Sequence, residues 1–539
     1  MSIISKLFRI TVFFSLLLLT GLLFTQKINL TTADIGRHIK NGAIFVQKGE
    51  ILNTNYYSYT QPDYHVINHH GGSGVLFYYV WLFFGFKGLS IFYTGLFLIT
   101  FCLFFYLARA YSTFAWAYVF SVLSVPLVVS RFEIRPEGFS YFFLGLFLLI
   151  LYKIRQGDLS PRWLWVLPAL QVLWVNIHIF FFLGPLLVFF FLADFWLNRE
   201  STPLVKSFQT LFVILILTCF INPFGFEGAL VPLTIFKEYG YRLAENQSVI
   251  FMQKRFPRNE LYPHFEVSFA LIFLSLIWLR LKTDLFRRHA FLVILFVFFS
   301  ALAWKAIRGI SLFGFILIPC ASIIFYSLSK EYFSRWGKRI SKILFCLAFA
   351  VVLSGFFWKN YYYSPYKNLQ LAYFMPELKG TRFWAIDLIK KIDQVPGLAP
   401  GINASASFFK DNHLEGPIFN NYDIGGFLIF HLFPQEGLFV DNRPEAYSVS
   451  FFKDTYVPMQ ERDDLWQKMD QTYQFNVIYF NRHDLTPWGQ NFLIQRIKDP
   501  LWAPVFVDGY TLILLKRNLK NARMITQFEL PKSLFKTSN

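Results

Sequence analysis

Two short polar segments contain the side chains best suited to chemistry. The first includes Asp34 and His38, which share one face if the segment is helical because they are four residues apart. The second reads Arg131-Phe132-Glu133-Ile134-Arg135-Pro136-Glu137-Gly138 and lies between two hydrophobic runs. Carboxylates can accept a proton from a hydroxyl group, and arginines can stabilise negative charge on a phosphate. Together the segments predict a site that handles a phosphate and moves a proton.

Further polar side chains lie at the ends of other hydrophobic runs. They include two histidines in Asn68-His69-His70-Gly71-Gly72-Ser73-Gly74 and an arginine in Lys305-Ala306-Ile307-Arg308. Arg308 directly precedes a hydrophobic run, so its charge must be paired or face water. The candidates for catalysis are Asp34 and Glu137, and those for substrate binding are His38, His69, His70, Arg131, Arg135, His178 and Arg308.

Each pattern also has a simpler structural interpretation. Thr31 followed by Asp34 three residues later is typical of a capping box at a helix start. The charges of residues 131–137 can neutralise one another as two salt bridges, and the glycines after His70 can form a flexible lead into a helix. In the carboxy-terminal third, Asp423 before Gly425-Gly426 suits a turn, and Asp441 with Arg443 suits an internal ion pair.

Several established motifs are missing from the sequence. It contains no P-loop, HExxH, GxSxG or DxD pattern, which argues against a nucleotide-powered pump, a zinc protease and an α/β-hydrolase. The four cysteines all lie in hydrophobic runs and form no CxxC spacing, so neither a disulfide framework nor a zinc site is predicted. A divalent metal remains possible, although the acidic residues are too scattered to assign one.

Composition excludes an ordinary soluble protein. Of 539 residues, 55% are hydrophobic and only 16% are charged, against about a quarter in soluble domains. Disorder is excluded as well, because it requires low hydrophobicity. The chain is therefore predicted to be a polytopic α-helical membrane protein of about eleven spans. The expected spans are Leu7–Phe24, Leu89–Leu107, Phe114–Val129, Phe139–Tyr152, Trp163–Ile177, Ile179–Leu197, Ser207–Ile221, Phe265–Leu279, Ala290–Trp304, Ile307–Leu328 and Ile343–Trp358.

Basic residues orient these spans. Lys6 and Arg9 precede the first span, which we expect to be a retained signal anchor with a cytoplasmic amino terminus. An odd number of spans then leaves the basic loops on the cytoplasmic side and the candidate site on the other. The first outer loop covers residues 26–88 and closes with Val75–Phe86, an aromatic stretch predicted to lie in the membrane interface.

The composition changes after residue 358. We expect a transmembrane domain over residues 1–358 and a soluble periplasmic α/β or α+β domain over residues 359–539. Short apolar runs bounded by turn residues are predicted to be strands, and a polar segment between them a helix. The predicted strands are Phe427–Phe430, Leu438–Val440, Val477–Phe480 and Tyr510–Leu515, and the predicted helix is Asp463–Thr472.

This layout resembles the GT-C superfamily of integral membrane glycosyltransferases, which includes the protein O-mannosyltransferases and the aminoarabinose transferases of lipid A. The resemblance rests on Asp34 directly after the first span, on the charged segment 131–137 after the third, and on a soluble domain after the last. Segments 49–60, 68–70, 419–428 and 439–447 are also similar to a poorly characterised bacterial branch of GT-C-like proteins.

The resemblance implies roles for several residues. Asp34 would be the general base that activates the acceptor, and Arg131, Arg135 and Arg308 would hold the phosphate. Glu137 would correspond to an acid that orients the site. The implied donor is a sugar on polyprenyl phosphate, and attack at its anomeric carbon would invert the configuration there. Some members of the superfamily use a divalent metal.

The expected acceptor is a glycan, lipid or protein on the periplasmic side of a bacterial inner membrane, and the expected partners include the lipid bilayer but no nucleic acid. Two other functions suit the same features: a transporter or flippase of lipid-linked saccharides, and a polysaccharide ligase or polymerase. A catalytically silent assembly or receptor protein is a further possibility, in which Asp34 would only cap a helix.

Overall fold

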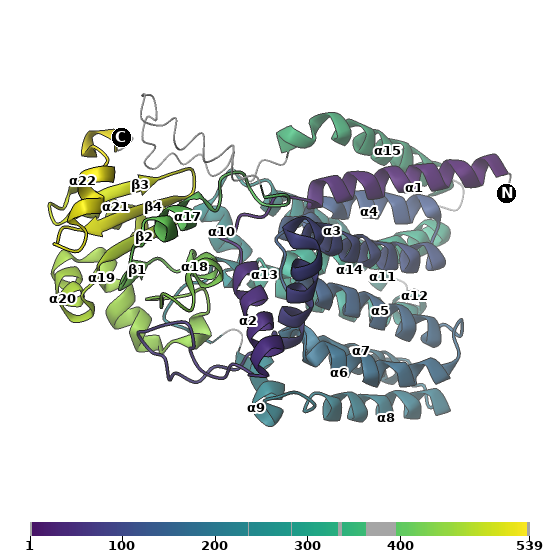
Figure 1. Ribbon diagram of the computed structural model, residues 1–539. Helices are drawn as coiled ribbons and strands as arrows, with labels where there is room; N and C mark the ends of the chain where they lie inside the picture. Colours follow the sequence, from purple (N-terminus) through teal and green to yellow (C-terminus); the bar gives the residue numbers. More distant parts are fainter. Residues whose placement is uncertain (1–2, 235–236, 282, 333–336, 363–394, 536–539) are drawn as a thin grey trace.

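The computed structural model describes residues 3–234, 237–281, 283–332, 337–362 and 395–535. Figure 1 shows two parts: long helices lie side by side, and a smaller mixed domain sits at one end of them. Helices α2 (Ile35–Lys48), α9 (Gly225–Leu230) and α10 (Val249–Arg255) lie around this junction. The stretch that joins the two parts in the chain, residues 363–394, lies outside the described residues.

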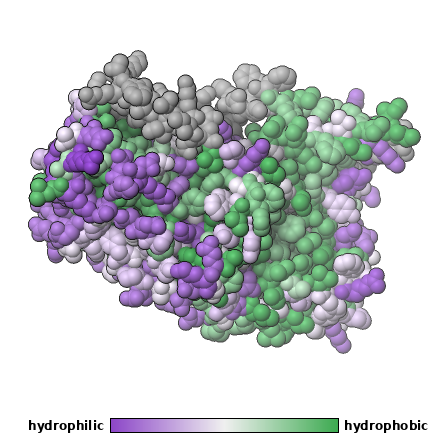
Figure 2. Space-filling view, in the orientation of Figure 1, coloured by the Kyte–Doolittle hydropathy of each residue, from purple (hydrophilic) through white to green (hydrophobic). Residues whose placement is uncertain are grey.

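The helical part is assembled from the hydrophobic runs of the sequence. Its remaining helices are α1 (Ile3–Phe24), α3 (Gly71–Tyr111), α4 (Phe114–Val128), α5 (Glu137–Arg155), α6 (Leu167–Val175), α7 (Leu183–Leu197), α8 (Pro203–Thr218), α11 (Leu261–Arg280), α12 (Thr283–Arg288), α13 (Ala290–Lys305), α14 (Gly309–Tyr332) and α15 (Gly337–Tyr362). Helix α14 lies at the centre, against α3, α4 and α13, and 17 of its 24 residues are buried. Figure 2 shows a broad hydrophobic belt over these helices and a hydrophilic surface on the mixed domain.

Within the described residues, eight helical segments are long and apolar enough to cross a membrane. Helices α8 and α13 are apolar but shorter. The predicted span Trp163–Ile177 consists of a 3-10 turn, Pro161–Val166, followed by the nine residues of α6. The structure therefore confirms a multi-span helical protein, and the number eleven stays a prediction.

The stretch predicted to lie in the membrane interface, Val75–Phe86, is helical and falls in the first segment of α3, before the bundle segment that holds the next predicted span. Its interfacial position stays a prediction. The helix breaks locally at Gly85, whose φ of 63° is in the left-handed region that glycine adopts without steric cost. The first half of α3 can thus belong to the outer loop while its second half belongs to the bundle.

The carboxy-terminal domain is built on a four-stranded mixed sheet. Its strands are β1 (Ile418–Asn420), β2 (Val477–Asn481), β3 (Trp502–Val507) and β4 (Thr511–Lys516), in the order β1-β2-β4-β3. β1 and β2 are parallel and the other pairs antiparallel. Its helices are α17 (Ala404–Asp411), α18 (Gly425–Leu432), α19 (Pro458–Glu461), α20 (Asp463–Tyr473), α21 (Gly489–Lys498) and α22 (Ala522–Phe528).

The strand predictions for this domain are right at two of four places. β2, β4 and the helix α20 are confirmed. The predicted strand Phe427–Phe430 is wrong, because these residues belong to α18. A short buried apolar run has the same composition in a helix as in a strand. In Leu438–Val440 only an isolated bridge from Leu438 to Ser58 forms. Strand β3 was not predicted from the sequence, because its Pro504 argues against a strand. This proline lies where the pairing between β3 and β4 shifts register.

The first outer loop is hydrogen-bonded to the carboxy-terminal domain. Tyr59 N–H donates to the Leu438 carbonyl at 3.1 Å, and Leu438 N–H donates to the Tyr57 carbonyl at 3.0 Å. The hydroxyl of Tyr59 donates to the carbonyl of Ile418 in β1 at 2.8 Å. Residues 57–60 therefore run beside the edge of the domain as an added segment of chain. This contact brings the amino-terminal polar segment against the carboxy-terminal one.

Candidate active site

Asp34 lies where the bundle, the first outer loop and the carboxy-terminal domain meet. It directly precedes α2, but within the described residues its side chain makes no capping hydrogen bond to that helix. Thr31 instead donates to Asn29 at 2.7 Å, so the predicted capping box is wrong. The Asp34 carboxylate accepts a hydrogen bond from the Asn442 side-chain amide and lies 3.3 Å from Arg135 Nη1.

Arg135 is surrounded by three carboxylates. Besides Asp34, its guanidinium lies 2.7 Å from Glu133 and 3.1 Å from Glu245. Arg135 belongs to the short connection before α5, and Glu245 comes from a 3-10 turn, Ala244–Asn246, more than a hundred residues further along the chain. Burial by itself disfavours a charged guanidinium, yet the attraction of these carboxylates raises the pKa of Arg135 above its ordinary value.

Glu245 joins the three predicted phosphate-binding arginines. Its two carboxylate oxygens lie 2.9 Å from Arg131, 3.1 Å from Arg135 and 2.9 Å from Arg308. The turn that carries it is held by two backbone hydrogen bonds from residues 307 and 308. Although burial favours the protonated acid, the three arginines hold the pKa of Glu245 well below its ordinary value. Glu245 is therefore a carboxylate that keeps three cations together.

Glu137 and Arg131 form the buried end of this cluster. Arg131 makes two hydrogen bonds to Glu137, at 2.7 and 3.0 Å, and the Glu137 side chain is only 3% exposed. Both salt bridges of the simpler interpretation thus exist, from Arg131 to Glu137 and from Arg135 to Glu133. These pairs do not make the segment a self-contained salt-bridge unit, because both arginines also contact Glu245 and Arg135 also contacts Asp34.

The acidic groups do not have the arrangement of a metal site. Among the described residues, no group of three histidine, cysteine or acidic side chains is placed to hold a metal ion. Asp34, Glu133 and Glu245 do converge, but they converge on the guanidinium of Arg135. A divalent cation at that point would face the fixed positive charge of the arginine, so these residues do not fit the metal used by some GT-C enzymes.

The four candidate histidines form one cluster, in which His38 and His178 are buried and His69 and His70 are partly buried. The His70 ring lies 4.0 Å from that of His69, 5.3 Å from His38 and 5.2 Å from His178, with which it stacks. Burial lowers the pKa of all four below the ordinary value, that of His69 to about 4. They are therefore neutral near pH 7 and can donate or accept hydrogen bonds without adding charge.

Hydrogen bonds fix the tautomer of His178. Trp174 Nε1 donates to the Ser140 hydroxyl at 2.7 Å, which leaves that hydroxyl free to donate to His178 Nδ1 at 2.8 Å. The backbone N–H of Phe180 donates to the same ring nitrogen at 3.3 Å. Because Nδ1 accepts, the proton of the neutral ring is on Nε2. The ring of Phe180 lies 4.7 Å from that of His178 and 5.7 Å from the Arg308 guanidinium.

A close helix crossing holds His38 and His70 together. Helix α2 packs on the first turns of α3 through Gly42 and Gly74, and a Cβ atom on Gly42 would overlap the backbone carbonyl of Gly74. The glycines after His70 therefore start a helix that approaches α2 at backbone distance. They are not a flexible lead.

We expect Gly42→Ala to force this crossing apart and to destabilise the protein by about 1–3 kcal/mol, the usual cost of overpacking. Gly95→Ala is the matched control, because a Cβ atom at Gly95 in the same α3 helix would meet nothing within 4 Å. Unfolding free energies of both variants in mixed micelles measure the difference. Equal stability of the two would contradict the crossing.

Two residues of the site were missed from the sequence. Glu245 lies in the polar stretch between two hydrophobic runs on the same predicted side as Asp34, so its position in an outer loop was the available signal. Asn442 follows the predicted ion pair partner Asp441, and the Asp441–Arg443 pair is confirmed at 2.6 Å. Asn442 also accepts a hydrogen bond from Arg37 Nε at 3.1 Å. A single amide thus links Asp34 to Arg37.

Asp423 is a further acidic group at this junction. It lies in the turn before α18, as the simpler interpretation predicts. Burial, reinforced by the charges of Asp484 and Asp34, raises its pKa to about 7. This carboxyl group therefore exchanges its proton in the neutral range, close to Asp34.

Comparisons with known proteins identify the architecture. No family model and no curated protein match the sequence. Solved structures of the oligosaccharyltransferase AglB from Archaeoglobus fulgidus do match the fold. The complex with an inhibitory peptide and a dolichol-phosphate has a TM-score of 0.55 at 11% identity, covering 94% of this chain and 74% of AglB. The apo form has a TM-score of 0.52 at 12% identity, covering 89% and 70%.

The chain shares the fold of AglB, in agreement with the predicted resemblance to the GT-C superfamily. The match spans the helical part and extends into the carboxy-terminal domain, since it covers nearly the whole chain. In the GT-C fold identified here, the predicted residues Asp34, Arg131, Arg135, Glu137 and Arg308 form one ionic cluster with Glu245. His38, His69, His70 and His178 form the adjoining imidazole cluster.

Proposed function

We propose that this protein is an inverting membrane glycosyltransferase that moves a sugar from a polyprenyl-phosphate donor to a glycan, lipid or protein acceptor. The observation that carries the proposal is the contact of the Asp34 carboxylate with an arginine, Arg135, that shares Glu245 with two further arginines. A base and an anion-binding cluster are the two groups that this reaction requires. The GT-C fold supports the same class of reaction.

In the proposed reaction, Asp34 accepts the proton of the acceptor hydroxyl group. The hydroxyl oxygen then forms a bond to the anomeric carbon as the bond from that carbon to the phosphate oxygen breaks. The electron pair of the broken bond stays on the leaving polyprenyl phosphate, whose charge Arg131, Arg135 and Arg308 stabilise. Glu137 acts indirectly by orienting Arg131. Asp34, Glu133, Glu137 and Glu245 pair with these three arginines, so each guanidinium has a carboxylate partner before a donor arrives.

We also propose a bacterial inner-membrane location with the amino terminus in the cytoplasm and the site outside it. Helix α5 carries Glu137 at its first residue and Lys153 and Arg155 in its last turn. Its 19 residues span about 28 Å at 1.5 Å each, close to the thickness of a bilayer core. The basic end is therefore the expected cytoplasmic end, and the domains 1–358 and 359–539 would lie in the membrane and the periplasm.

The test is transfer by the purified protein in lipid vesicles. Polyprenyl-phosphate sugars labelled with carbon-13 at the anomeric carbon are supplied together with a periplasmic extract as the source of acceptors. We expect donor consumption and a glycosidic product whose anomeric configuration is the opposite of the donor's. A product of retained configuration would refute the inverting mechanism. Movement of donor across the bilayer without any product would instead identify a transporter or flippase.

The hydrogen bond from Asn442 to Asp34 should influence how the transfer rate depends on pH. Burial already raises the pKa of Asp34 above its ordinary 3.8, against the opposing charges of Arg135 and Arg37. Because the base must be deprotonated, the rate should rise as pH passes through this pKa. Asn442→Ala removes a donor that favours the carboxylate, so it should move the acid limb of kcat/KM to higher pH and lower kcat about tenfold. An unchanged pH profile would contradict a positioning role. The control is Asn518→Ala, which removes an exposed asparagine of the same domain that, in the described part of the chain, hydrogen-bonds to Asn476 and Asn521 and to no residue of the ionic cluster.

A further inference from the structure

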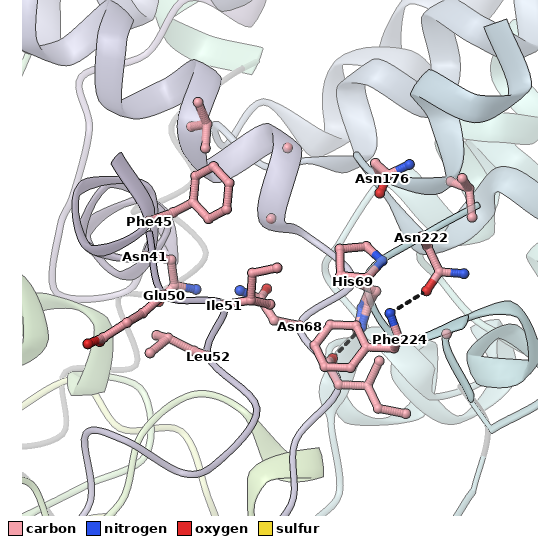
Figure 3. Close-up of a pocket in the computed structure, with 17 residues that line it drawn as sticks. Asn41, Phe45, Glu50, Ile51, Leu52, Asn68, His69, Asn176, Asn222 and Phe224 are labelled. Atoms are coloured by element: carbon pink, nitrogen blue, oxygen red, sulfur yellow. Dashed lines mark hydrogen bonds between the residues drawn. The ribbon is translucent and has the colours of Figure 1, made fainter. Parts of the chain in front are cut away.

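A pocket of about 200 Å³ is lined in part by His69 of the imidazole cluster (Figure 3). Its walls come from α2, the first outer loop, the start of α3 and the polar turns after α6 and α8. The lining residues that give the wall its chemistry are Asn41, Asn68, Asn176, Asn222, Phe45 and Phe224.

The chemistry of this wall differs from that of the ionic cluster. None of the described lining residues is a lysine or arginine, and Glu50 is the single carboxylate among them. Four are asparagines and two are phenylalanines. A phosphate would find no cation here, whereas amide groups and aromatic faces suit a neutral ligand that carries both hydroxyl groups and C–H surfaces.

Several side-chain amides of the pocket wall have a hydrogen-bonding group that is not used within the protein. The Asn41 carbonyl accepts from Tyr57 at 2.6 Å and the Asn68 carbonyl accepts from the backbone of His70 at 3.3 Å, so each Nδ2 group remains a donor. Asn176 uses its Nδ2 group on two backbone carbonyls, which leaves its Oδ1 atom as an acceptor. Among the described residues, none of these three groups has a protein partner. Asn41 is only 7% exposed and lines the pocket, so its side-chain amide has little contact with open solvent.

The pocket is too far from Asp34 to hold the reacting atoms. Asn41 follows Asp34 by seven residues, which is about 10 Å along a helix. His38 and His70 lie between them, with rings 5.3 Å apart. A ligand in the pocket therefore touches His69 but not the ionic cluster. Pockets for drug-sized molecules range from about 300 to 1,000 Å³, so this smaller pocket suits one sugar ring.

We propose that this pocket is a subsite for a neutral sugar unit that does not itself react, on a substrate that carries at least two sugar units. The proposal rests on the proposed function for its role in transfer, but the pocket's affinity for a sugar does not depend on catalysis. Asn41, Asn68 and Asn176 bind the hydroxyl groups of the ring, and Phe45 packs against its C–H face. The imidazole cluster connects this unit to the reacting one.

The first experiment measures binding alone. Saturation-transfer NMR on the detergent-solubilised full chain uses methyl glycosides of a hexose, a 6-deoxyhexose and an N-acetylhexosamine as probes. At least one should give a signal that falls at least fivefold in Asn68→Ala and in Phe45→Leu. Phe83→Leu, an exposed aromatic residue of α3 outside the pocket, is the matched control and should leave the signal unchanged. Absence of any signal, or a signal that the pocket variants do not change, would overturn the proposal.

The second experiment measures transfer with donors of one and two sugar units. Phe45→Leu should raise KM about tenfold for the two-sugar donor or acceptor and leave KM for the one-sugar substrate unchanged. Equal effects on both substrates would refute a subsite for a second unit. The variant Asp34→Asn distinguishes a failure of the sugar subsite from a failure of the proposed mechanism. Loss of the NMR signal in this variant would contradict the sugar subsite. Transfer at the parental rate would contradict only the role of Asp34 as the base.

Discussion

Replacing Asp34 by Asn is expected to lower kcat for sugar transfer about 100- to 10,000-fold, the range that one general base contributes. Asn has nearly the volume of Asp, and it can still accept the hydrogen bond that Asn442 donates. What it loses is the ability to take a proton and the charge that pairs with Arg135. In the proposed mechanism the arginines, and not Asp34, bind the donor phosphate, so KM for the donor should change little.

The matched control is Asp63→Asn, an exposed acid in the same outer loop. It removes the same charge from the same region without touching the ionic cluster, and it should keep the parental kcat. Single-turnover kinetics in vesicles measure both variants, and circular dichroism checks that each retains its helices. Parental kcat in Asp34→Asn would show that this carboxylate is not the base.

Glu245→Gln should destabilise the protein by about 3 kcal/mol or more, in addition to abolishing transfer. Glu245 contacts Arg131, Arg135 and Arg308 within 3.1 Å, and all four side chains are at most 20% exposed. Removing one partner of a buried pair leaves the other charge uncompensated, which costs about 3–5 kcal/mol. Here one substitution removes a negative charge that is shared by three guanidinium groups.

Glu227→Gln is the control for this prediction. Glu227 pairs with His65 at 3.1 Å in the same outer region, but the two side chains are 64% and 59% exposed, and pairs of this kind contribute at most about 1 kcal/mol. Unfolding free energies from denaturant titration in mixed micelles measure both variants. If Glu245→Gln were no less stable than Glu227→Gln, the cluster could not depend on the carboxylate.

The sequence predicted those features that depend on composition and local pattern. Hydrophobic runs located the long helices, and Asp463–Thr472 was recognisable as α20 because its polar pattern has helical periodicity. Asp34 and Arg135 could be assigned to one side of the membrane because the number of spans between them and the positions of basic loops fix their side. Their 3.3 Å contact follows that assignment.

Other features depend on tertiary contacts that local pattern does not encode. Phe427–Phe430 satisfies the composition of a buried strand, and only its packing against α2 and the sheet decides for a helix. Glu245 gains its importance from three arginines far away in the chain. Asp34 had the sequence context of a helix cap, and its actual partners, Asn442 and Arg135, come from segments that no local rule connects to it.

The hydrogen bond between Asn442 and Asp34 joins residues that are 408 positions apart in the chain. Asn442 belongs to the last quarter of the chain to be synthesised, so Asp34 lacks this partner until translation is nearly finished. A chain that terminates before residue 442 would therefore contain the helical part of the protein without the hydrogen bond that supports the Asp34 carboxylate.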